Sequence, residues 1–501
     1  MTSPPNVLWI MADQLRYDYL SCYGHSNLHT PNIDALASRG VQFSNAYVQS
    51  PVCGPSRMSA YTGRYVRSHG STWNGMPLRV GERTIGDHLK ENGIQSVLVG
   101  KTHMVADAEG MAWLGIDPSS EIGVRVSECG FVPFERDDGL HPNSARQRWS
   151  SYDDYLAEKG YISDNPWGDF ANSGLDENGD LLSGWLLKNS RLPANIPEEH
   201  SETAYMTNRA MDFMAQARES DQPWLCHLSY IKPHWPYIVP SPYHEMYSDD
   251  DINNPIRSDK EKQTNHPLLR AYQNARVSKC FSRDEVREHV IPAYMGLIKQ
   301  LDDNLGRLFQ WMDKSNLSEN TIIIFTSDHG EALASHGIYA KNLAAFEEIY
   351  RIPMIIAGPG IKENKESDDL VSSMDLCPTI LDLFDQKEIS NIDSSSFKNI
   401  LCTEEVNTIE KSFAEYDGTR LQLKQRVLWY KNLKYIFNGF DYDELYDLDS
   451  DPNEMTNLID SDNHKNERQM MIKLYWEELK KNGDHSIYNL DNNPIMKIIE
   501  I

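Results

Sequence analysis

The chain has 501 residues, of which 40% are hydrophobic and 10% aromatic, and its formal net charge is −26. A chain this long and this apolar buries a large core, divided into two or more domains, and is not disordered. So acidic a protein repels nucleic acid, because nucleic-acid binding needs clustered Lys and Arg, and we expect no nucleic-acid partner.

The N-terminal residues have none of the features of a secretion signal. The apolar run at residues 6–12 is too short to span a membrane, and no basic stretch or small-residue cleavage site accompanies it. The seven Cys are an odd number at wide spacings, which predicts no disulfide framework. We therefore expect a cytoplasmic protein with no membrane partner.

Up to about residue 390, short apolar runs alternate with stretches of helical periodicity. This alternation predicts an α/β fold with a large, mostly parallel sheet flanked by helices. The predicted strands are residues 6–12, 96–99, 224–230, 321–326 and 353–357. The predicted helices are residues 32–39, 55–65, 84–91, 202–217 and 293–313. Two stretches, 105–200 and 240–290, lack clear periodicity, which is typical of substrate loops.

The pattern changes from about residue 405. Strand-like segments at residues 413–416, 427–430, 434–437 and 443–447 are separated by turns, and a helical pattern follows at 465–481. These segments predict a smaller α+β domain with an antiparallel sheet. We therefore place a catalytic domain at residues 1–400 and a C-terminal domain with its tail at residues 401–501.

Polar residues follow four of the predicted strands, at the edge where ligands bind in an open parallel sheet. Asp13-Gln14 and Asp328-His329 end two of the strands. Together they predict a site for one divalent cation. The oxygen ligands favour Ca²⁺ first, with Mg²⁺ or Mn²⁺ as alternatives, and the imidazole adds some preference for Mn²⁺. Taken alone, Asp328 is equally typical of a helix N-cap.

The other two strand ends carry basic side chains. Lys101 and His103 follow one strand, and Lys232 and His234 follow the other. Four polar strand ends that meet at one edge are difficult to explain by loop composition alone, and they indicate an active site.

The segment Cys53-Gly54-Pro55-Ser56-Arg57 lies at the start of a predicted helix. Pro55 is typical of a first helical turn, so Cys53 is expected just before the helix N-terminus, where free amide groups favour an oxyanion. Two simpler interpretations remain open. Cys53 could be a structural residue, or it could act as a thiolate activated by the helix and Arg57.

The segment Cys53-x-Pro55-Ser56-Arg57, followed by Thr62-Gly63-Arg64, resembles the signature of the type I, formylglycine-dependent sulfatases in the alkaline phosphatase superfamily. The resemblance extends over nearly the whole chain. It includes the segments that begin at Asn6, Thr30, Gly100, Pro233, Ser327, Arg351, Leu445 and Asp451.

The resemblance implies that Cys53 is oxidised to formylglycine and acts as the nucleophile in its hydrated form. It implies one metal ion held by Asp13, Gln14, Asp328 and His329, with the modified Cys53 beside it.

The resemblance also implies roles for the surrounding side chains. Arg57 would hold the diol, and Lys101 and Lys341 would stabilise charge on the transferred group. His234 would protonate the leaving alcohol, and His103 would take a proton from the second hydroxyl. Substrate contact is expected from Asn74.

Two departures from the common pattern indicate a branch of the family. Gln14 and His329 stand where many sulfatases carry Asp and Asn, as in choline sulfatases and phosphonate monoester hydrolases. Gly54 and the stretch from Tyr230 also favour the phosphonate hydrolases, whereas the pair Lys101 and His103 favours true sulfatases. We therefore expect sulfate ester hydrolysis first, and phosphonate monoester or phosphate diester hydrolysis second.

A non-catalytic, anion-binding relative is the alternative from another functional class. The resemblance further implies a small sulfate ester as substrate and a formylglycine-generating enzyme as partner during maturation, and it is compatible with a homo-oligomer. Two interpretations of the tail at residues 484–501 stay open: it packs on another subunit of such an oligomer, or it is a frayed terminus.

Overall fold

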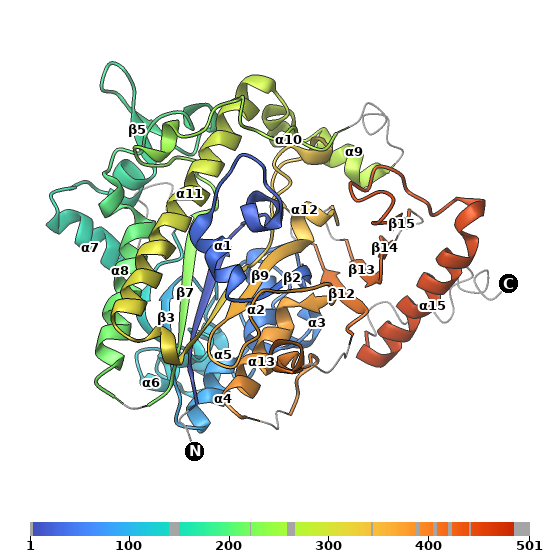
Figure 1. Ribbon diagram of the computed structural model, residues 1–501, viewed down its shortest axis with the longest axis horizontal. Coiled ribbons are helices and arrows are strands. Elements are labelled where there is room, and N and C mark those ends of the chain that lie inside the picture. The colour runs from blue at the N-terminus through green and yellow to red at the C-terminus, as the bar shows by residue number, and fades with distance from the viewer. Residues whose placement is uncertain are drawn as a thin grey trace.

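The computed structural model describes residues 4–139, 150–220, 222–257, 266–341, 344–386, 390–403, 408–418, 423–439 and 442–484. Figure 1 shows a large central sheet with helices on both faces and a smaller sheet beside it. The predicted tail at residues 484–501 lies, apart from Asp484, outside the described residues.

The large sheet has nine strands in the described residues, in the order β10-β2-β9-β8-β1-β7-β3-β4, with β11 paired to β2. The central strands are β1 (Asn6–Asp13), β7 (Trp224–Pro233) and β8 (Thr321–Ser327), which run parallel, as do β3 (Gln95–Gly100) and β4 (Val132–Arg136). The strand β9 (Arg351–Ala357) is antiparallel to β8 and to β2 (Gly40–Tyr47). The short strands β10 (Lys365–Ser367) and β11 (Val371–Ser372) complete the edge.

Every residue of β7 and β8 is buried, as expected for parallel strands covered on both faces. One hydrophobic core joins the sheet to α1 (Pro31–Ser38), α8 (Glu202–Ala217) and α11 (Asp284–Lys314). A second core joins the opposite face to α2 (Cys53–Thr62), α4 (Ile85–Glu91) and α13 (Leu376–Leu383). The predicted mostly parallel α/β sheet is confirmed.

The helix α11 is longer than predicted. The apolar pattern predicted a start at residue 293, but the helix begins at Asp284 and continues through Pro292. Proline removes one backbone hydrogen bond, and tertiary packing offsets this cost, because Val290, Ile291 and Pro292 are all buried.

The C-terminal sheet has four antiparallel strands, β12 (Lys411–Tyr416), β13 (Gln425–Tyr430), β14 (Leu433–Phe437) and β15 (Glu444–Asp447). Side chains alternate along β13: Val427 and Trp429 face the core of the large sheet, and Leu428 faces α15 (Lys465–Asn482). The predicted antiparallel sheet and its helix are confirmed, and the domain boundary at residue 400 stays a prediction.

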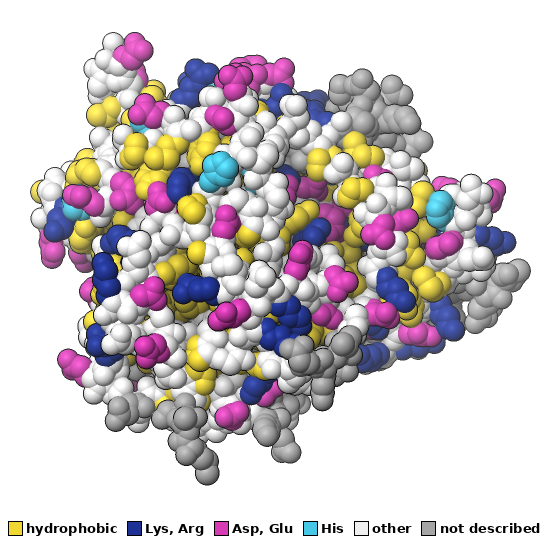
Figure 2. All heavy atoms as spheres, in the orientation of Figure 1, with side chains coloured by type: hydrophobic (Ala, Val, Ile, Leu, Met, Phe, Trp, Pro, Cys, Tyr) yellow, Lys and Arg dark blue, Asp and Glu magenta, His cyan; other side chains and the backbone are white. Residues whose placement is uncertain are grey.

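The stretches predicted as irregular contain short elements. They include α5 (Ala108–Leu114), α6 (Glu121–Val126), α7 (Ser151–Glu158), β5 (Ser173–Leu175), β6 (Leu181–Ser183), α9 (Pro267–Gln273) and α10 (Arg276–Phe281). None of the described helices has both the length and the apolar character needed to cross a bilayer. Acidic side chains are spread among Lys and Arg over the face seen in Figure 2.

Candidate active site

The carboxyl ends of β1 and β8 place their polar residues side by side. The two strands pair in parallel, with Ala12 opposite Ser327, so Asp13 and Asp328 follow at the same edge. The backbone N–H of Gln14 donates to Asp328 Oδ1 at 3.0 Å. The register of β1 against β7 shifts after Ala12, and Gln14 has a φ of 65°. A left-handed conformation is uncommon in a non-glycine residue and is kept only where the surrounding structure holds it.

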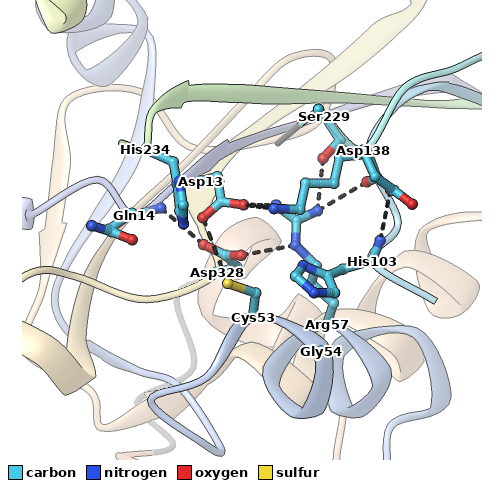
Figure 3. Close-up of polar contacts among 12 residues, drawn as sticks. Asp13, Gln14, Cys53, Gly54, Arg57, His103, Asp138, Ser229, His234 and Asp328 are labelled. Atoms are coloured by element: carbon cyan, nitrogen blue, oxygen red, sulfur yellow. Dashed lines mark hydrogen bonds and ion pairs between the residues drawn. The ribbon is translucent and has the colours of Figure 1, made fainter. Parts of the chain in front are cut away.

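Cys53 occupies the first position of α2, with Val52 as N-cap, and it is fully buried. The helix therefore begins two residues earlier than predicted, and Cys53 lies within it rather than before it. Its sulfur is 3.2 Å from His329 Nε2 and 3.9 Å from Asp13 Oδ1. The structure thus brings the predicted nucleophile and the predicted metal ligands together, as Figure 3 shows.

Arg57 lies one turn along α2, and its fully buried guanidinium lies beside the two carboxylates (Figure 3). Its Nε donates to Asp328 Oδ2 at 2.8 Å, and a terminal nitrogen lies 3.5 Å from Asp13 Oδ2. The other terminal nitrogen donates to Ser229 Oγ at 2.7 Å and to the Lys101 carbonyl at 2.9 Å. The guanidinium therefore contacts both carboxylates and fixes their positions.

Two lysines converge on the same cluster. The ammonium of Lys101 is paired with Asp13 Oδ2, and that of Lys341 lies 2.7 Å from Cys53 Sγ. Burial opposes ionisation of Asp13, but Lys101, His234 and Lys341 outweigh it and hold the pKa of that carboxyl well below its usual range. Burial likewise opposes ionisation of Cys53, but Lys341, His329 and Lys101 bring the pKa of that thiol well below its usual value. The cluster strongly favours anionic groups.

The two predicted proton-transfer residues lie on either side of Cys53. Hydrogen bonding from His103 contributes to the lowered pKa of the Cys53 thiol, and His234 Nδ1 lies 2.6 Å from the Trp235 carbonyl. Burial lowers the pKa of His234, against the opposing attraction of Asp13. His103 has a φ of 56°, a second left-handed residue in the site.

Asn74 contacts the start of α2. Its Oδ1 accepts the Gly54 N–H at 2.8 Å, so it satisfies one of the free amide groups of the first turn. A Cβ on Gly54 would lie 2.8 Å from the same oxygen. Asn74 is thus next to the nucleophile, and its predicted contact with substrate stays a prediction.

The donor set fits a divalent cation. Asp13, Cys53, Asp328 and His329 each offer one ligand atom, and these four atoms all lie within 4.8 Å of one another. A positive charge already lies against this set, because Lys341 Nζ is 2.7 Å from His329 Nε2. Carboxylate, amide and imidazole groups gathered around a positive charge have the chemistry that a metal site requires.

Three residues of the site were missed by the sequence interpretation: the fully buried Ser229 and Glu331, and the partly exposed Asp138. Asp138 accepts the N–H groups of Thr102 and His103 at 3.1 and 3.0 Å, but it follows β4, a strand that was not predicted. The polar side chain of Ser229 in a buried strand was an available signal. Glu331 accepts from Gln14 Nε2 and had no distinct signal in the sequence.

Comparison with known proteins agrees with this geometry. Residues 5–386 match the sulfatase family, and residues 334–482 match the C-terminal part of N-sulphoglucosamine sulphohydrolase. The chain belongs to the sulfatase family. The predicted fold and the predicted enzyme class, a hydrolase of the sulfatase type, are thereby confirmed.

Several sulfatase relatives align along most of this chain. An uncharacterised sulfatase of Escherichia coli K12 is 30% identical over 91% of this chain and 83% of its own length. An arylsulfatase of Clostridium perfringens is 27% identical over 98% of this chain and 97% of its own. A choline-sulfatase of Rhizobium meliloti is 26% identical over 92% of this chain and 83% of its own.

Among solved structures, a phosphonate monoester hydrolase of Silicibacter pomeroyi superposes with a TM-score of 0.82. It is 25% identical, and the match covers 96% of each chain. The predicted position of this sulfatase near choline sulfatases and phosphonate monoester hydrolases is confirmed.

Proposed function

We propose that this sulfatase hydrolyses sulfate esters, releasing sulfate and an alcohol or phenol, with Cys53 converted to formylglycine. The observation that carries the proposal is the position of the Cys53 sulfur. It lies at a helix N-terminus, 2.7 Å from Lys341 Nζ and within 4 Å of both His329 and Asp13. Residue 53 therefore faces the metal-ligand set from a position that favours anions.

Asp13, Gln14, Asp328 and His329 would hold one divalent cation, and that cation would supply Lewis acidity at residue 53 when bound. Formylglycine hydrate at residue 53 would supply the attacking hydroxyl and a second hydroxyl whose deprotonation releases the sulfate. Unmodified Ser or Thr lacks that second hydroxyl. Ca²⁺ is the first candidate for the metal, because oxygen atoms make up most of the donor set.

Each of the surrounding side chains has a separate role in the proposed reaction. Arg57 keeps the two carboxylates in place, and the buried Lys101 and Lys341 stabilise negative charge on the transferred group. His234 donates a proton to the departing ester oxygen as its bond to sulfur breaks. His103 takes the proton from the second hydroxyl of residue 53, which allows the bond to sulfate to break. A formylglycine-generating enzyme would act on the chain during maturation.

Hydrolysis of phosphonate monoesters is the second candidate, favoured by the similarity to the Silicibacter pomeroyi enzyme. The cations Lys101 and Lys341 favour the sulfate ester, because two positive charges suit a group with more terminal oxygens.

One experiment separates the two substrate classes. The rates of hydrolysis of an aryl sulfate, choline sulfate, a phosphonate monoester and a phosphate diester are measured side by side on one preparation. We expect a sulfate ester to be the fastest, and a phosphonate monoester that is faster would reverse the order. Intact mass reports the modification directly, because formylglycine lowers the mass by about 18 Da. An unshifted mass in active protein would contradict the proposed nucleophile.

A further inference from the structure

We propose that Glu331 is a positioning residue that presents the side-chain oxygen of Gln14 to the metal ion. The inference rests on the proposed function, because it requires a divalent cation bound at Gln14. It extends that function by naming the group that decides which atom of the Gln14 amide faces the cation.

The amide of Gln14 has one orientation compatible with its neighbours. Its Nε2 donates to Glu331 Oε2 and to the Tyr237 hydroxyl at 3.2 Å, and its Oε1 accepts from Lys341 Nζ at 3.0 Å. A carboxylate only accepts hydrogen bonds, and an ammonium group only donates them. In Figure 3 the amide oxygen of Gln14 lies on the side of Asp328 and Cys53, and the nitrogen is turned away.

Glu331 is held firmly in place. Its side chain is fully buried, and its Oε1 accepts the backbone N–H groups of Leu333 at 3.1 Å and Ala340 at 2.5 Å. With Gln14 as a third donor, the carboxylate contacts both the amide and the backbone that leads to Lys341. The same carboxylate therefore connects a predicted metal ligand with a predicted charge-stabilising residue.

Gln14 can act as a metal ligand only when its amide oxygen, and not its nitrogen, faces the cation. Ca²⁺ and Mg²⁺ bind amide oxygen, whereas an amide NH₂ group has no lone pair to offer and repels a cation. A carboxylate at position 14 would present oxygen in either orientation, but an amide needs a partner that selects one. Groups that orient metal ligands commonly change metal affinity about 10- to 100-fold when they are replaced.

The test is the dissociation constant of Ca²⁺ for metal-depleted protein, measured for wild type and Glu331→Gln. The oxygen of the new amide can satisfy Leu333 and Ala340, which leaves its NH₂ group facing the NH₂ group of Gln14. Gln14 must then turn its oxygen away from the site, and we expect Ca²⁺ to bind about 10- to 100-fold more weakly.

A second variant restores the complementary pair. In Gln14→Glu/Glu331→Gln the amide at position 331 donates to one carboxylate oxygen at position 14, and the other oxygen faces the cation. We expect the affinity for Ca²⁺ to return to within about threefold of wild type, which a general loss of folding at position 331 would not allow. Tyr237→Phe is the matched control, because it removes the 3.2 Å contact to the same nitrogen and leaves Glu331 in place.

Unchanged affinity in Glu331→Gln, or a double variant as weak as the single one, would overturn the role of Glu331 and leave the proposed function standing. Wild-type protein that binds no Ca²⁺, Mn²⁺ or Mg²⁺ would overturn the metal site and the role of Glu331 together.

Discussion

At the scale of single residues, Cys53 combines burial with a dense set of neighbouring cations. Its sulfur contacts Lys341 and His329, and it lies at the first position of α2. The other cysteines of the described residues have no such surroundings: Cys129, Cys226 and Cys377 are buried, and their pKa values are raised by burial. Residue type alone therefore does not identify the nucleophile, whereas its neighbours do.

Replacement of Cys53 tests the nucleophile. We expect Cys53→Ala to lower kcat by more than about a thousandfold, because no other group can form the covalent bond to the substrate. The measurement is turnover of the best substrate from the panel. Cys22→Ala and Cys402→Ala are the matched controls, since both lie in partly exposed positions away from the metal-ligand set. Equal activity in all three variants would exclude Cys53 as nucleophile.

Replacement of Asp328 tests the metal site. Asp328 is one of the four residues whose ligand atoms cluster, and it also binds Arg57. We expect Asp328→Ala to be purified with less than about a tenth of the wild-type metal content, measured by elemental analysis, because an anionic ligand is lost. Asp302→Ala is the control, because it removes an equally buried carboxylate that accepts hydrogen bonds from the start of α1. This variant should be purified with the wild-type metal content. Unchanged metal content in Asp328→Ala would place the metal elsewhere.

At the scale of elements, the first turn of α2 is the most closely fitted part of the site. Gly54 allows Asn74 to approach the backbone, because a side chain there would lie 2.8 Å from Asn74 Oδ1. The turn sets the position of Cys53 relative to β1 and β8. Sequence periodicity predicts such a helix but not the neighbour that fits against it.

We expect Gly54→Ala to lower kcat/KM by about 10- to 100-fold, because displacement of a catalytic group by a fraction of an ångström is enough for such a loss. The double variant Gly54→Ala/Asn74→Ala removes the clashing oxygen and should recover part of the activity. Kinetics and thermal unfolding are measured for both. A Gly54→Ala protein with wild-type kinetics would show that the first turn tolerates displacement.

At the scale of the whole molecule, a buried ion cluster joins the C-terminal sheet to the large sheet. Lys434 on β14 binds Glu347 Oε1 at 3.0 Å and Glu454 Oε1 at 2.7 Å, and the Trp429 indole donates to Glu347 at 2.9 Å. Glu347 begins α12 (Glu347–Tyr350), which leads into β9. The cluster therefore anchors the smaller sheet near the segment that carries Lys341.

We expect Lys434→Ala to lower the free energy of unfolding by about 3–5 kcal/mol, because it leaves two buried carboxylates without their cation. Urea denaturation measures the change. Lys431→Ala, which removes the exposed pair with Glu410, should stay within about 0.5 kcal/mol of wild type. Similar losses of unfolding free energy in the two variants would show that burial of the ion pair does not increase its contribution to stability.

Buried histidines make stability depend on pH. His69 is 1% exposed, its Nδ1 accepts the Ser71 N–H at 3.1 Å, and burial lowers its pKa to about 3. Below an unfolded pKa of about 6.5 the unfolded chain takes up a proton that the folded chain does not, so this residue removes stability as the pH falls from 6.5 toward 3.

A variant isolates this contribution. We expect the stability advantage of wild type over His69→Asn to shrink by about 2 kcal/mol between pH 7 and pH 5. Urea denaturation at both values provides the measurement. Ser59→Ala removes a hydrogen-bond partner of His69 but keeps the imidazole, so its difference from wild type should be nearly constant. A constant difference for His69→Asn would show that the residue is protonated in the folded protein.

The sequence by itself determined the α/β class, the antiparallel C-terminal sheet and most of the site, including Asp13, Cys53 and Asp328. It could do so because strand and helix periodicity are local, and because parallel strands end at a common edge. The start of α11 at Asp284 and the strand β2 depended on packing that no local pattern reports.

Only the tertiary structure decided the orientation of the site. The left-handed conformations of Gln14 and His103, and the contacts of Asp138 and Glu331 with them, join residues that are far apart along the chain. Such contacts arise from the pairing of β1 with β8 and of β3 with β4. The residues that hold the ligands in place are therefore defined by distance in space and not by spacing in the sequence.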